Sequence, residues 1–455
     1  DQWYALVDGP DLLPDIMVGR MPDTNLSRLE YLFSKSIGYE MDPLIQGTWQ
    51  RNAIMTAMHS NPQHATILTK QEISDTLAAW GMNVRERYNA QAVPGNLIPL
   101  INQGVTFYNY RGEWCAEYDW GGTFGPWDVA YVNNTRKLGV WTILSCSSAD
   151  IVYGYPTIAE LMLRVGYENP TSPRGAVALI GSQGYTHANF NNPLDTGFYE
   201  AFTRQGASLL GEAFVASKAY LSTVTAPTDS QAATLREYTI LGDPSLQVWT
   251  DVPAALAVSI SPPAVPEGFT TNVSILAADS TTGTPVPDAL VCLLRQDDVY
   301  VYGYTDENGS AALPVTPESS GSSGLSIGVT VTGYNRMPWF GTLETLTQRP
   351  AAPENVSAEL HDGTWTIRWS PVLADERGLA ADIDRYEIEM TTDGDSNEGG
   401  VDSLHVVSGT SATLLPAPRN ASARVVAISR DGLRSRPSSG VGILRCEIHT
   451  GGGGR

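Results

Sequence analysis

Two hydrophobic patterns alternate along the first 249 residues. Near-continuous runs of apolar, β-branched and aromatic residues occupy four segments, at 53–58, 104–110, 140–145 and 176–180. Such runs are typical of strands buried on both faces, as in a parallel sheet. Between them, apolar residues recur every three or four positions in three segments, at 26–37, 71–80 and 157–165. This period predicts helices, the first capped by Asp23 or Thr24, and the alternation predicts an α/β domain with a parallel sheet.

The pattern changes at Val252, where helical periodicity disappears. Short β-rich runs separated by turn signals, such as residues 305–309, predict an all-β sandwich that ends near Glu344. Residues 349–353 read Arg-Pro-Ala-Ala-Pro, which predicts a stiff linker. Alternating runs after the linker predict a second β-sandwich, at 365–369, 386–389 and 423–428. We therefore predict a multidomain chain with four parts: an α/β domain at 1–249, β-sandwiches at 250–347 and 348–447, and a Gly-rich tail at 448–455.

Composition narrows the classes of function. The 455 residues include 28 Lys and Arg against 49 Asp and Glu, which gives a net charge of −21. A chain this acidic repels phosphate backbones and anionic membrane surfaces, so we expect no nucleic-acid partner. No apolar stretch reaches ~20 residues, which predicts that the chain has no transmembrane segment. The sequence starts at Asp1 without a Met or a signal peptide, and we expect that processing or the choice of segment removed what came before.

Candidate chemistry lies where parallel strands end, because ligands bind at the carboxyl ends of strands in open α/β sheets. Cys146 stands where the buried run at 140–145 emerges into a loop. A thiol there is accessible, and nearby helix N-termini would favour its thiolate, so Cys146 is a candidate nucleophile. Two other interpretations remain open: a small buried apolar residue, or a disulfide with Cys115. The four cysteines are too few for a disulfide scaffold and do not fix the redox compartment.

An acidic, Trp-rich loop follows the run at 104–110. Its members are Glu113, Glu117, Asp119 and Asp128, with Trp114, Trp120 and Trp127. The loop either lines a substrate cleft, holds a structural Ca²⁺ through its carboxylates, or is simply solvated with packed aromatic rings. We find no P-loop, zinc-ligand spacing or dinucleotide fingerprint, so no other cofactor is expected.

Seven segments between about Asp1 and Trp249 carry a family likeness: 1–4, 14–20, 35–40, 104–112, Ser145-Cys146, 176–182 and 241–246. Through these segments the chain resembles the gingipain family of cysteine peptidases. The resemblance implies a caspase-like α/β catalytic domain. The following segment is similar to the family's immunoglobulin-like module, and the third domain resembles fibronectin type III, through 369–371, 386–388 and 431–435. The first part of the family's catalytic region is missing, so we expect an upstream segment, bound as a separate cleaved chain of the same precursor.

The resemblance also implies roles for single residues. Cys146 would be the nucleophile, and the backbone N–H groups of Gly112 and Cys146 would hold the oxyanion. The family's general-base His aligns with Glu113, however, and a carboxylate of ordinary pKa cannot protonate a leaving amine at neutral pH. Two histidines are candidate substitutes. His59 would form a swapped pair with Glu113, and His187 would reach the same cleft from the next loop; otherwise each is an ordinary loop histidine.

Two functions follow from these residues. The first is a secreted or cell-surface, gingipain-like cysteine endopeptidase that acts on a protein or peptide substrate, with Cys146 and an atypical base. The second is a pseudopeptidase that serves as a structural, adhesive or binding component of an extracellular assembly. The absence of His at position 113 favours the second, and the retained Cys146 keeps the first open. Substrate specificity, surface anchoring and oligomeric state do not follow from the sequence.

Overall fold

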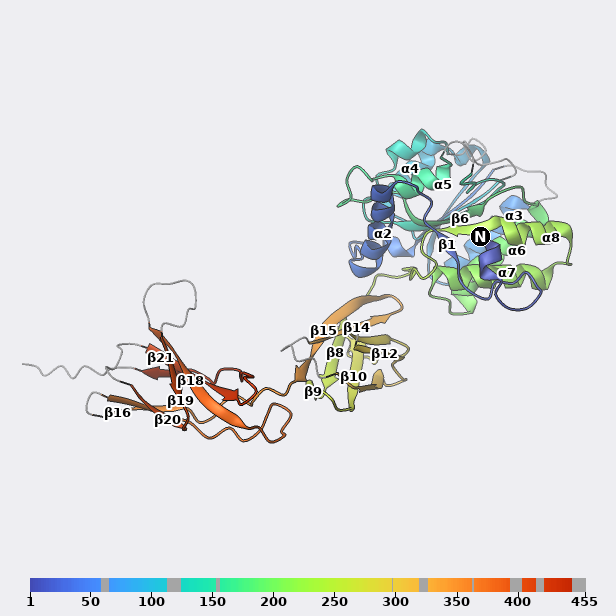
Figure 1. The fold of residues 1–455 in the computed structure, drawn as a ribbon. Coiled ribbons are helices and arrows are strands. Elements are labelled where there is room, and N and C mark those ends of the chain that lie inside the picture. The colour runs from blue at the N-terminus through green and yellow to red at the C-terminus, as the bar shows by residue number, and fades with distance from the viewer. Residues whose placement is uncertain are drawn as a thin grey trace, which may run out of the picture. The chain divides into compact units, whose positions relative to one another are not determined.

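The computed structural model describes residues 1–58, 65–112, 124–152, 156–296, 298–318, 326–361, 364–392, 403–414 and 421–443. The described chain divides into two compact units. The first holds Asp1–Leu256 together with two short segments, Asp279–Gly283 and Thr332–Pro338. The second contains the remaining β-strands (Figure 1). The four boundaries predicted from the sequence stay predictions, because nothing in this division tests them.

A mixed sheet lies at the centre of the first unit. Within the described residues it has seven strands in the order β1-β7-β6-β5-β4-β2-β3. Their bounds are β1 Gly19–Arg20, β2 Asn52–Ala57, β3 Asn83–Tyr88, β4 Phe107–Arg111, β5 Gly139–Leu144, β6 Ala176–Ser182 and β7 Tyr238–Leu241. Every residue of β4, β5, β6 and β7 is buried, as the near-continuous apolar runs predicted for β5 and β6.

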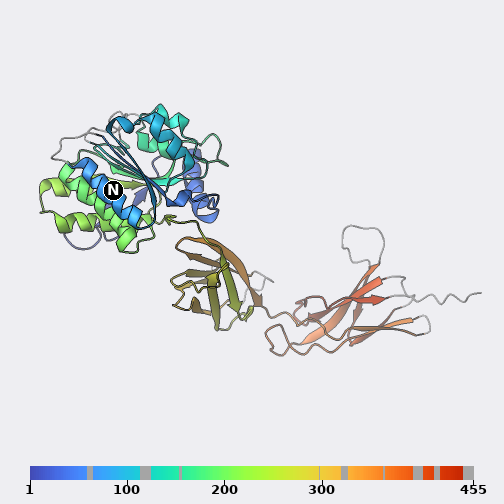
Figure 2. The same cartoon turned by 180° about the vertical axis from the view of Figure 1, so that it is seen from behind.

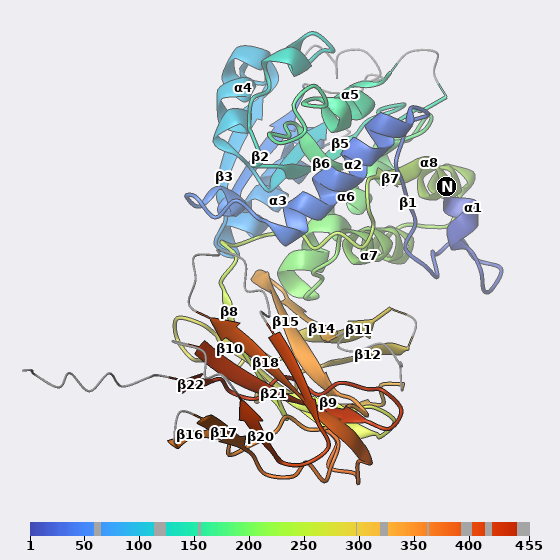
Figure 3. The same ribbon diagram turned by 60° about the vertical axis from the view of Figure 1, so that its left-hand side comes forward.

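Helices cover both faces of this sheet (Figures 1 and 2). One layer packs α2 Leu26–Met41, α4 Pro94–Gln103 and α5 Ile158–Arg164 against the sheet. The other packs α3 Thr66–Ala79, α6 Ala188–Arg204 and α7 Leu210–Val224. In Figure 3, α2 lies across the sheet beside β6. Two shorter helices complete the unit, α1 Gln2–Ala5 and α8 Asp229–Glu237.

Three sequence predictions for this unit need correction. The sheet is not wholly parallel, because β7 runs antiparallel to β6. β1 pairs in parallel with β7 and therefore has the same reversed direction. The chain leaves β6, passes through α6, α7 and α8, and returns to the edge where β6 ends, so β7 must run back across the sheet. The cap of α2 is Asn25, whose side chain accepts a hydrogen bond from Arg28 N, and neither Asp23 nor Thr24 caps the helix. The helix predicted at 71–80 begins earlier than expected, because α3 already starts at Thr66.

The second unit is built from β-strands in two successive β domains. The first has sheets ordered β13-β10-β8 and β12-β11-β14-β15-β9, and the second has β16-β17-β20 and β19-β18-β21-β22. The first domain's strands are β8 Leu256–Ser261, β9 Ala264–Pro266, β10 Thr271–Asp279, β11 Leu290–Arg295, β12 Val299–Tyr304, β13 Ser310–Val315, β14 Ile327–Gly333 and β15 Arg336–Leu346. Those of the second are β16 Ser357–His361, β17 Thr364–Arg368, β18 Ile383–Thr392, β19 Ser403–Val407, β20 Ser411–Leu414, β21 Ala421–Ser429 and β22 Val441–Ile443.

Alternation of buried and exposed positions explains these strands. Along β10 and β14, every second residue is buried, which is the pattern of a sheet with one face on a core. In the second β domain, side chains from both sheets share one core, with Ile367 from one sheet and Ile388 from the other fully buried in it. Among the described helices, the longest has 17 residues, and none is apolar and long enough to cross a membrane.

Candidate active site

The carboxyl ends of three neighbouring strands form one edge of the central sheet. Arg111, the last residue of β4, lies opposite Leu144, the last residue of β5. On the other side, Ser182 at the end of β6 pairs with Tyr238, where β7 begins. Cys146 follows β5 by two residues and is therefore at this edge. Loops that follow adjacent parallel strands meet in space, so this edge is the expected place for a ligand.

The loop that carries Cys146 is held by the loop after β6. Ser147 has a φ of +48°, a left-handed conformation that turns the chain sharply after the cysteine. Its N–H donates to Gly184 O at 2.9 Å, and Ala149 N donates to Ser182 O at 2.9 Å. The hydroxyl of Ser148 accepts from Ser182 N at 2.9 Å. These bonds fix the position of Cys146 through its neighbours rather than through its own side chain.

Gly181 allows the two loops to approach each other so closely. A Cβ atom at this position would lie 2.8 Å from the Cβ of Ala149 and 2.8 Å from Ser148 Oγ. Both neighbours belong to the buried turn after Cys146. The glycine is thus required by packing, because real Cβ atoms do not approach other heavy atoms to that distance.

The thiol of Cys146 is half-buried and faces Thr186. Among the described residues, Cys146 and Cys292 have free thiols. Thr186 N donates a hydrogen bond to Cys146 Sγ at 3.3 Å, and Thr186 Oγ1 lies 3.8 Å from the same sulfur. Asn191, on α6, donates from Nδ2 to Thr186 Oγ1 at 3.0 Å. The sulfur is therefore held by a loop that α6 in turn supports.

Arg111 lies buried beside this loop, with an exposed fraction of 1%. Its guanidinium donates to Gly112 O at 2.6 Å and Leu144 O at 3.1 Å. It also donates to Asn192 Oδ1 at 3.1 Å and reaches Ala188 O at 3.4 Å, both on α6. Burial lowers the pKa of Arg111, while the nearby acidic groups oppose that change. A guanidinium nevertheless stays charged in proteins.

A second buried cation lies on the same face of the sheet. Lys70, on α3, pairs with Asp195 on α6, and both side chains are fully buried. Lys70 also donates to Asn109 Oδ1 on β4, and Asn109 Nδ2 donates to Asp195 Oδ1 at 2.9 Å. Burial lowers the pKa of Lys70 to about 8, although its pairing with Asp195 acts in the opposite direction. Lys70, Asp195 and Asn109 form a closed network, which we call the buried triad.

The structure brings some of the predicted site residues together. Gly112 lies at the end of β4, and a Cβ atom there would be 2.1 Å from the hydroxyl oxygen of Tyr110. His187 is exposed and stands at the N-cap position of α6, directly after Thr186. It therefore shares the loop that contacts Cys146. His59 and Glu113 lie outside the described residues, so their predicted pairing stays a prediction.

The acidic loop is described only at its end. Its predicted members Glu113, Glu117 and Asp119 fall outside the described residues, as does Cys115. Asp128 accepts a hydrogen bond from Gly125 N at 2.6 Å. In the part of the chain that the structure describes, no group of three or more His, Cys, Asp or Glu side chains is close enough to hold a metal ion.

Sequence reasoning missed several members of this edge. They are Arg111, Thr186, Asn191, Tyr238 and the buried triad. A signal was present in β4, Phe-Tyr-Asn-Tyr-Arg, where Asn109 and Arg111 occupy alternate positions and thus share a face. A polar side chain on the inner face of a buried strand needs a buried partner. That partner is on α6, more than 75 residues away, and no local pattern indicates it.

Comparisons with known proteins agree with this architecture. Residues 1–249 match the sequence profile of peptidase family C25. Gingipain R1 of Porphyromonas gingivalis is 24% identical over 392 aligned residues, which cover 81% of this chain and 37% of that protein. The crystal structure of the Arg-specific cysteine proteinase gingipain R has a TM-score of 0.66 at 21% identity, covering 76% of this chain and 78% of that one. A complex of the pro- and mature domains of RgpB from P. gingivalis has a TM-score of 0.67 at 21% identity, covering 76% and 80%.

The two kinds of likeness differ in what they establish. At 21% identity, the solved structures show a shared fold and nothing about substrate. The chain spans just over a third of the length of Gingipain R1, so the activity of that whole protein does not carry over. The family profile, by contrast, covers more than half of the chain, including all seven strands of the central sheet and Cys146. The chain therefore belongs to peptidase family C25, whose gingipain-type members are cysteine peptidases.

Proposed function

We propose that the α/β domain is a cysteine endopeptidase whose nucleophile is Cys146. One observation carries this proposal: a half-buried free thiol lies at the carboxyl edge of the sheet and accepts a hydrogen bond from Thr186 N at 3.3 Å. A cysteine that served only as core packing would be inert and need no such donor. The turn at Ser147 and the contact at Gly181 hold this thiol in a defined position.

In the proposed reaction, the thiolate of Cys146 attacks the carbonyl carbon of a peptide bond. The oxyanion that forms is held by the backbone N–H groups of Gly112 and Cys146. Collapse of this intermediate breaks the C–N bond, and the leaving amine must take up a proton. Water then attacks the thioester, releases the acid and regenerates the thiol. The chain therefore needs one group that first removes and then supplies a proton.

We propose His59, positioned by Glu113, as that group, with His187 as the second candidate. The position of His187 next to Thr186 supports its candidacy, because the loop of Thr186 already contacts the sulfur. Glu113 alone is a poor choice, since an ionised carboxylate has no proton to give to an amine. An imidazole has an ordinary pKa near 6.5 and exchanges protons readily at neutral pH.

The rate of Cys146 alkylation by iodoacetamide tests this function, measured from about pH 5 to about pH 9 with Cys146→Ser as the control. We expect rapid labelling with a midpoint below the ~8.5 of a free thiol. His59→Ala and His187→Ala should then be compared, together with Glu113→Gln. Removal of the histidine that acts as the base should lower the rate of peptide cleavage by at least about a hundredfold. An alkylation midpoint near or above about pH 8.5 would contradict the proposal.

A pseudopeptidase is the second candidate, and Glu113 is the observation that favours it. In that case the α/β domain is a binding component of an extracellular assembly. Cleavage of a mixed peptide library decides between the two functions. If Cys146 labels at a low midpoint but no peptide is cut, the thiol is retained without turnover and the binding function is favoured.

For the remainder of the chain, we propose a role outside the cell. The two β domains would be an immunoglobulin-like and a fibronectin type III-like module that present the α/β domain on a secreted or cell-surface protein. An upstream segment of the same precursor is a proposed partner, which agrees with the complex of pro- and mature domains known for RgpB. Mass spectrometry of the native protein under non-denaturing conditions would detect such a chain.

A further inference from the structure

We infer that Arg111 is a positioning residue for the nucleophile: its buried positive charge stabilises the thiolate of Cys146. The inference rests on the proposed function, because it concerns the same thiol. In this arrangement the negative charge of the nucleophile is balanced by a guanidinium from the neighbouring strand. The thiolate then persists whether or not a histidine beside it is protonated.

The contacts of Arg111 connect it to both loops that hold the sulfur. The guanidinium donates to Leu144 O, two residues before Cys146. It also reaches Ala188 O, two residues after Thr186, whose N–H donates to the sulfur. Arg111 thus lies between the loop that carries the nucleophile and the loop that contacts it. A thiolate at Cys146 would raise the pKa of Arg111, so the two groups are near enough for their charges to interact.

The partners that Arg111 has among the described residues leave its charge unneutralised. All four acceptors, three backbone carbonyls and the Asn192 amide oxygen, are neutral groups. Among the described residues, Arg111 forms no ion pair with a carboxylate. The carboxylate of Asp195 acts on Arg111 electrostatically, but it already pairs with Lys70. Within the described residues of this region, two cations therefore share one carboxylate, and a thiolate at Cys146 would make the group neutral. An unpaired buried charge is costly, so the protein gains by forming the thiolate.

The other groups near Cys146 that the structure describes do not provide this charge. Thr186 and Asn191 are neutral, and the buried hydroxyl of Tyr238 interacts with both Cys146 and Arg111. Burial raises the pKa of Tyr238 above its ordinary value, so this phenol stays uncharged at neutral pH. The residue before Tyr238 is Glu237, whose carboxylate would oppose a thiolate if it were ionised. Burial raises the pKa of Glu237 above its ordinary value. His187 is exposed next to Thr186, and its charge would be screened by solvent.

A guanidinium can stabilise charge but cannot exchange protons, which separates two tasks. Because a guanidinium keeps its proton in proteins, Arg111 neither removes the thiol proton nor gives one to a leaving amine. It therefore keeps the nucleophile ionised, and any cleavage of an amide still depends on His59, His187 or another proton donor. This division predicts that Arg111 affects the pH profile of the thiol, whereas a histidine affects turnover.

The test is the pH profile of Cys146 alkylation in Arg111→Met and Arg111→Lys. Removal of the charge should raise the alkylation midpoint by at least about one pH unit, which is roughly tenfold less thiolate below that midpoint. Arg111→Lys keeps a cation and should give a midpoint between those of the wild type and Arg111→Met. The matched control is Arg164→Met, which removes a mostly buried arginine that pairs with Asp23 and Glu160 in the other helix layer. The control should leave the midpoint unchanged.

The outcomes separate this inference from the proposed function. A low midpoint that stays the same in Arg111→Met overturns the role of Arg111 and leaves the nucleophile in place. A wild-type midpoint at or above ~8.5 that rises further in Arg111→Met overturns the activated nucleophile but supports the charge interaction. Equal shifts in Arg111→Met and Arg164→Met would mean a general loss of structure, and would overturn the inference.

A measurement on the wild type applies if Arg111→Met fails to fold. At about pH 9 an imidazole of ordinary pKa is neutral, so within the described part of the site the guanidinium of Arg111 is the cation that remains near the sulfur. A local positive charge accelerates anionic iodoacetate relative to neutral iodoacetamide. The ratio of the two rates at Cys146 should therefore exceed the ratio at Cys292, a free thiol in the same chain. Peptide mapping separates the two sites, and equal ratios would overturn the inference.

Discussion

Lys70 and Asp195 form an ion pair from which solvent is completely excluded. Their side chains have exposed fractions of 0%, and they connect α3 to α6 across the end of β4. The amide of Asn109 completes the contacts of both partners. Such a pair is costly to form in a core, yet once formed neither partner can be lost without leaving a charge without its counterpart.

Removal of one partner of this pair should therefore destabilise the α/β domain strongly. For Lys70→Met we expect a loss of about 3 to 5 kcal/mol in the free energy of unfolding, because Asp195 is left buried and unpaired. The double variant Lys70→Met, Asp195→Leu should recover much of that loss. Urea unfolding of the double variant and of both single variants, Lys70→Met and Asp195→Leu, measures the coupling, and losses that simply add would contradict this account.

Lys218 is buried with no carboxylate partner among the described residues, and it predicts a pH dependence of stability. Its ammonium donates to Gln2 Oε1 and to Tyr238 O, and burial lowers its pKa to about 7. Between about pH 7 and the ordinary ~10.4 of lysine, the unfolded chain binds more protons than the folded chain at this residue. The contribution of Lys218 to stability therefore rises with pH over that range.

The difference in unfolding free energy between wild type and Lys218→Met isolates this contribution. It should change by up to about 1.4 kcal/mol per pH unit above pH 7, in favour of the wild type as pH rises. Lys137→Met, at a half-buried position, is the control and should show a flat difference. A flat difference for Lys218→Met as well would show that the buried amine keeps its proton over this pH range, and would contradict the lowered pKa.

Gly181 predicts a specific effect on the thiol. In Gly181→Ala the new methyl group would lie 2.8 Å from Ala149 Cβ and would push the turn after Cys146 away from β6. We expect the free energy of unfolding to fall by about 1 to 3 kcal/mol and the alkylation of Cys146 to become slower. Gly38→Ala is the matched control, because nothing lies within 4 Å of the new atom and the site is inside α2. The free energy of unfolding of Gly38→Ala should rise by about 0.5 to 1 kcal/mol, and the alkylation rate of Cys146 should stay unchanged.

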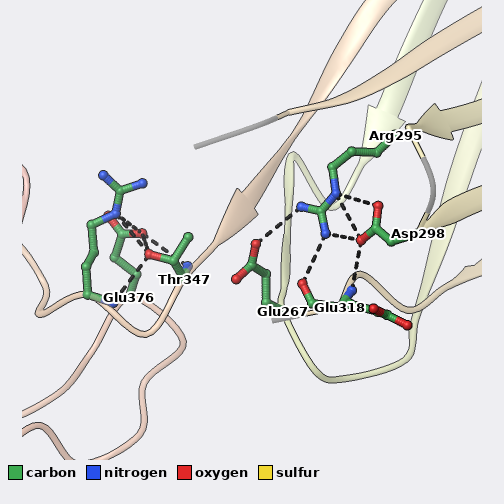
Figure 4. A network of polar contacts seen from close by, with 7 residues as sticks. Glu267, Arg295, Asp298, Glu318, Thr347 and Glu376 are labelled. Atoms are coloured by element: carbon green, nitrogen blue, oxygen red, sulfur yellow. Dashed lines mark hydrogen bonds and ion pairs between the residues drawn. The ribbon is translucent and has the colours of Figure 1, made fainter. Parts of the chain in front are cut away.

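Arg295 holds the polar network of the first β domain (Figure 4). Its mostly buried guanidinium pairs with Asp298 and Glu267 and donates to Glu318 O at 3.1 Å. Arg295→Met should lower the free energy of unfolding by about 3 kcal/mol, because two carboxylates lose their counter-charge. Arg385→Met removes an exposed pair with Asp384 and should cost less than about 1 kcal/mol.

This network also predicts how acid affects the domain. The hydrogen bond from Arg295 lowers the pKa of Asp298 below its ordinary value. A lowered folded pKa gives stability that is present above the ordinary carboxylate value of ~3.9 and is lost as pH falls through the lowered value. The difference in unfolding free energy between the wild type and Arg295→Met should thus shrink below about pH 4. A constant difference down to about pH 2 would contradict the ion pair.

Much of the central sheet could be predicted because its strands are buried on both faces. β2, β5 and β6 appear as apolar runs, and their order along the chain indicated where Cys146 emerges. β3 was missed because it lies at the edge of the sheet, where its sequence Asn-Val-Arg-Glu-Arg-Tyr needs no apolar face on the open side. β1 has only two residues, which is too short to show any period.

The site was harder to predict than the sheet. Position alone indicated Cys146, because a cysteine at the end of a buried strand is a local pattern. Arg111 looked like an ordinary polar residue at a strand end, since its acceptors on α6 are 77 and 81 residues away. Likewise, the cap of α2 moved to Asn25 because Asp23 is taken up by ion pairs with Arg28 and Arg164. Long-range partners decide such roles, and a single sequence does not display them.

The burial of lysine has a practical consequence for anyone who handles this protein. The chain has four lysines, and Lys35, Lys70 and Lys218 are all buried in the α/β domain, which leaves Lys137 as the one partly open to solvent. Acylating dyes, amine cross-linkers and amine-coupled sensor surfaces will therefore react with very few sites on the folded protein. The same scarcity makes lysine acylation a sensitive gauge of folding, because each additional modified lysine reports that a particular part of the core has opened.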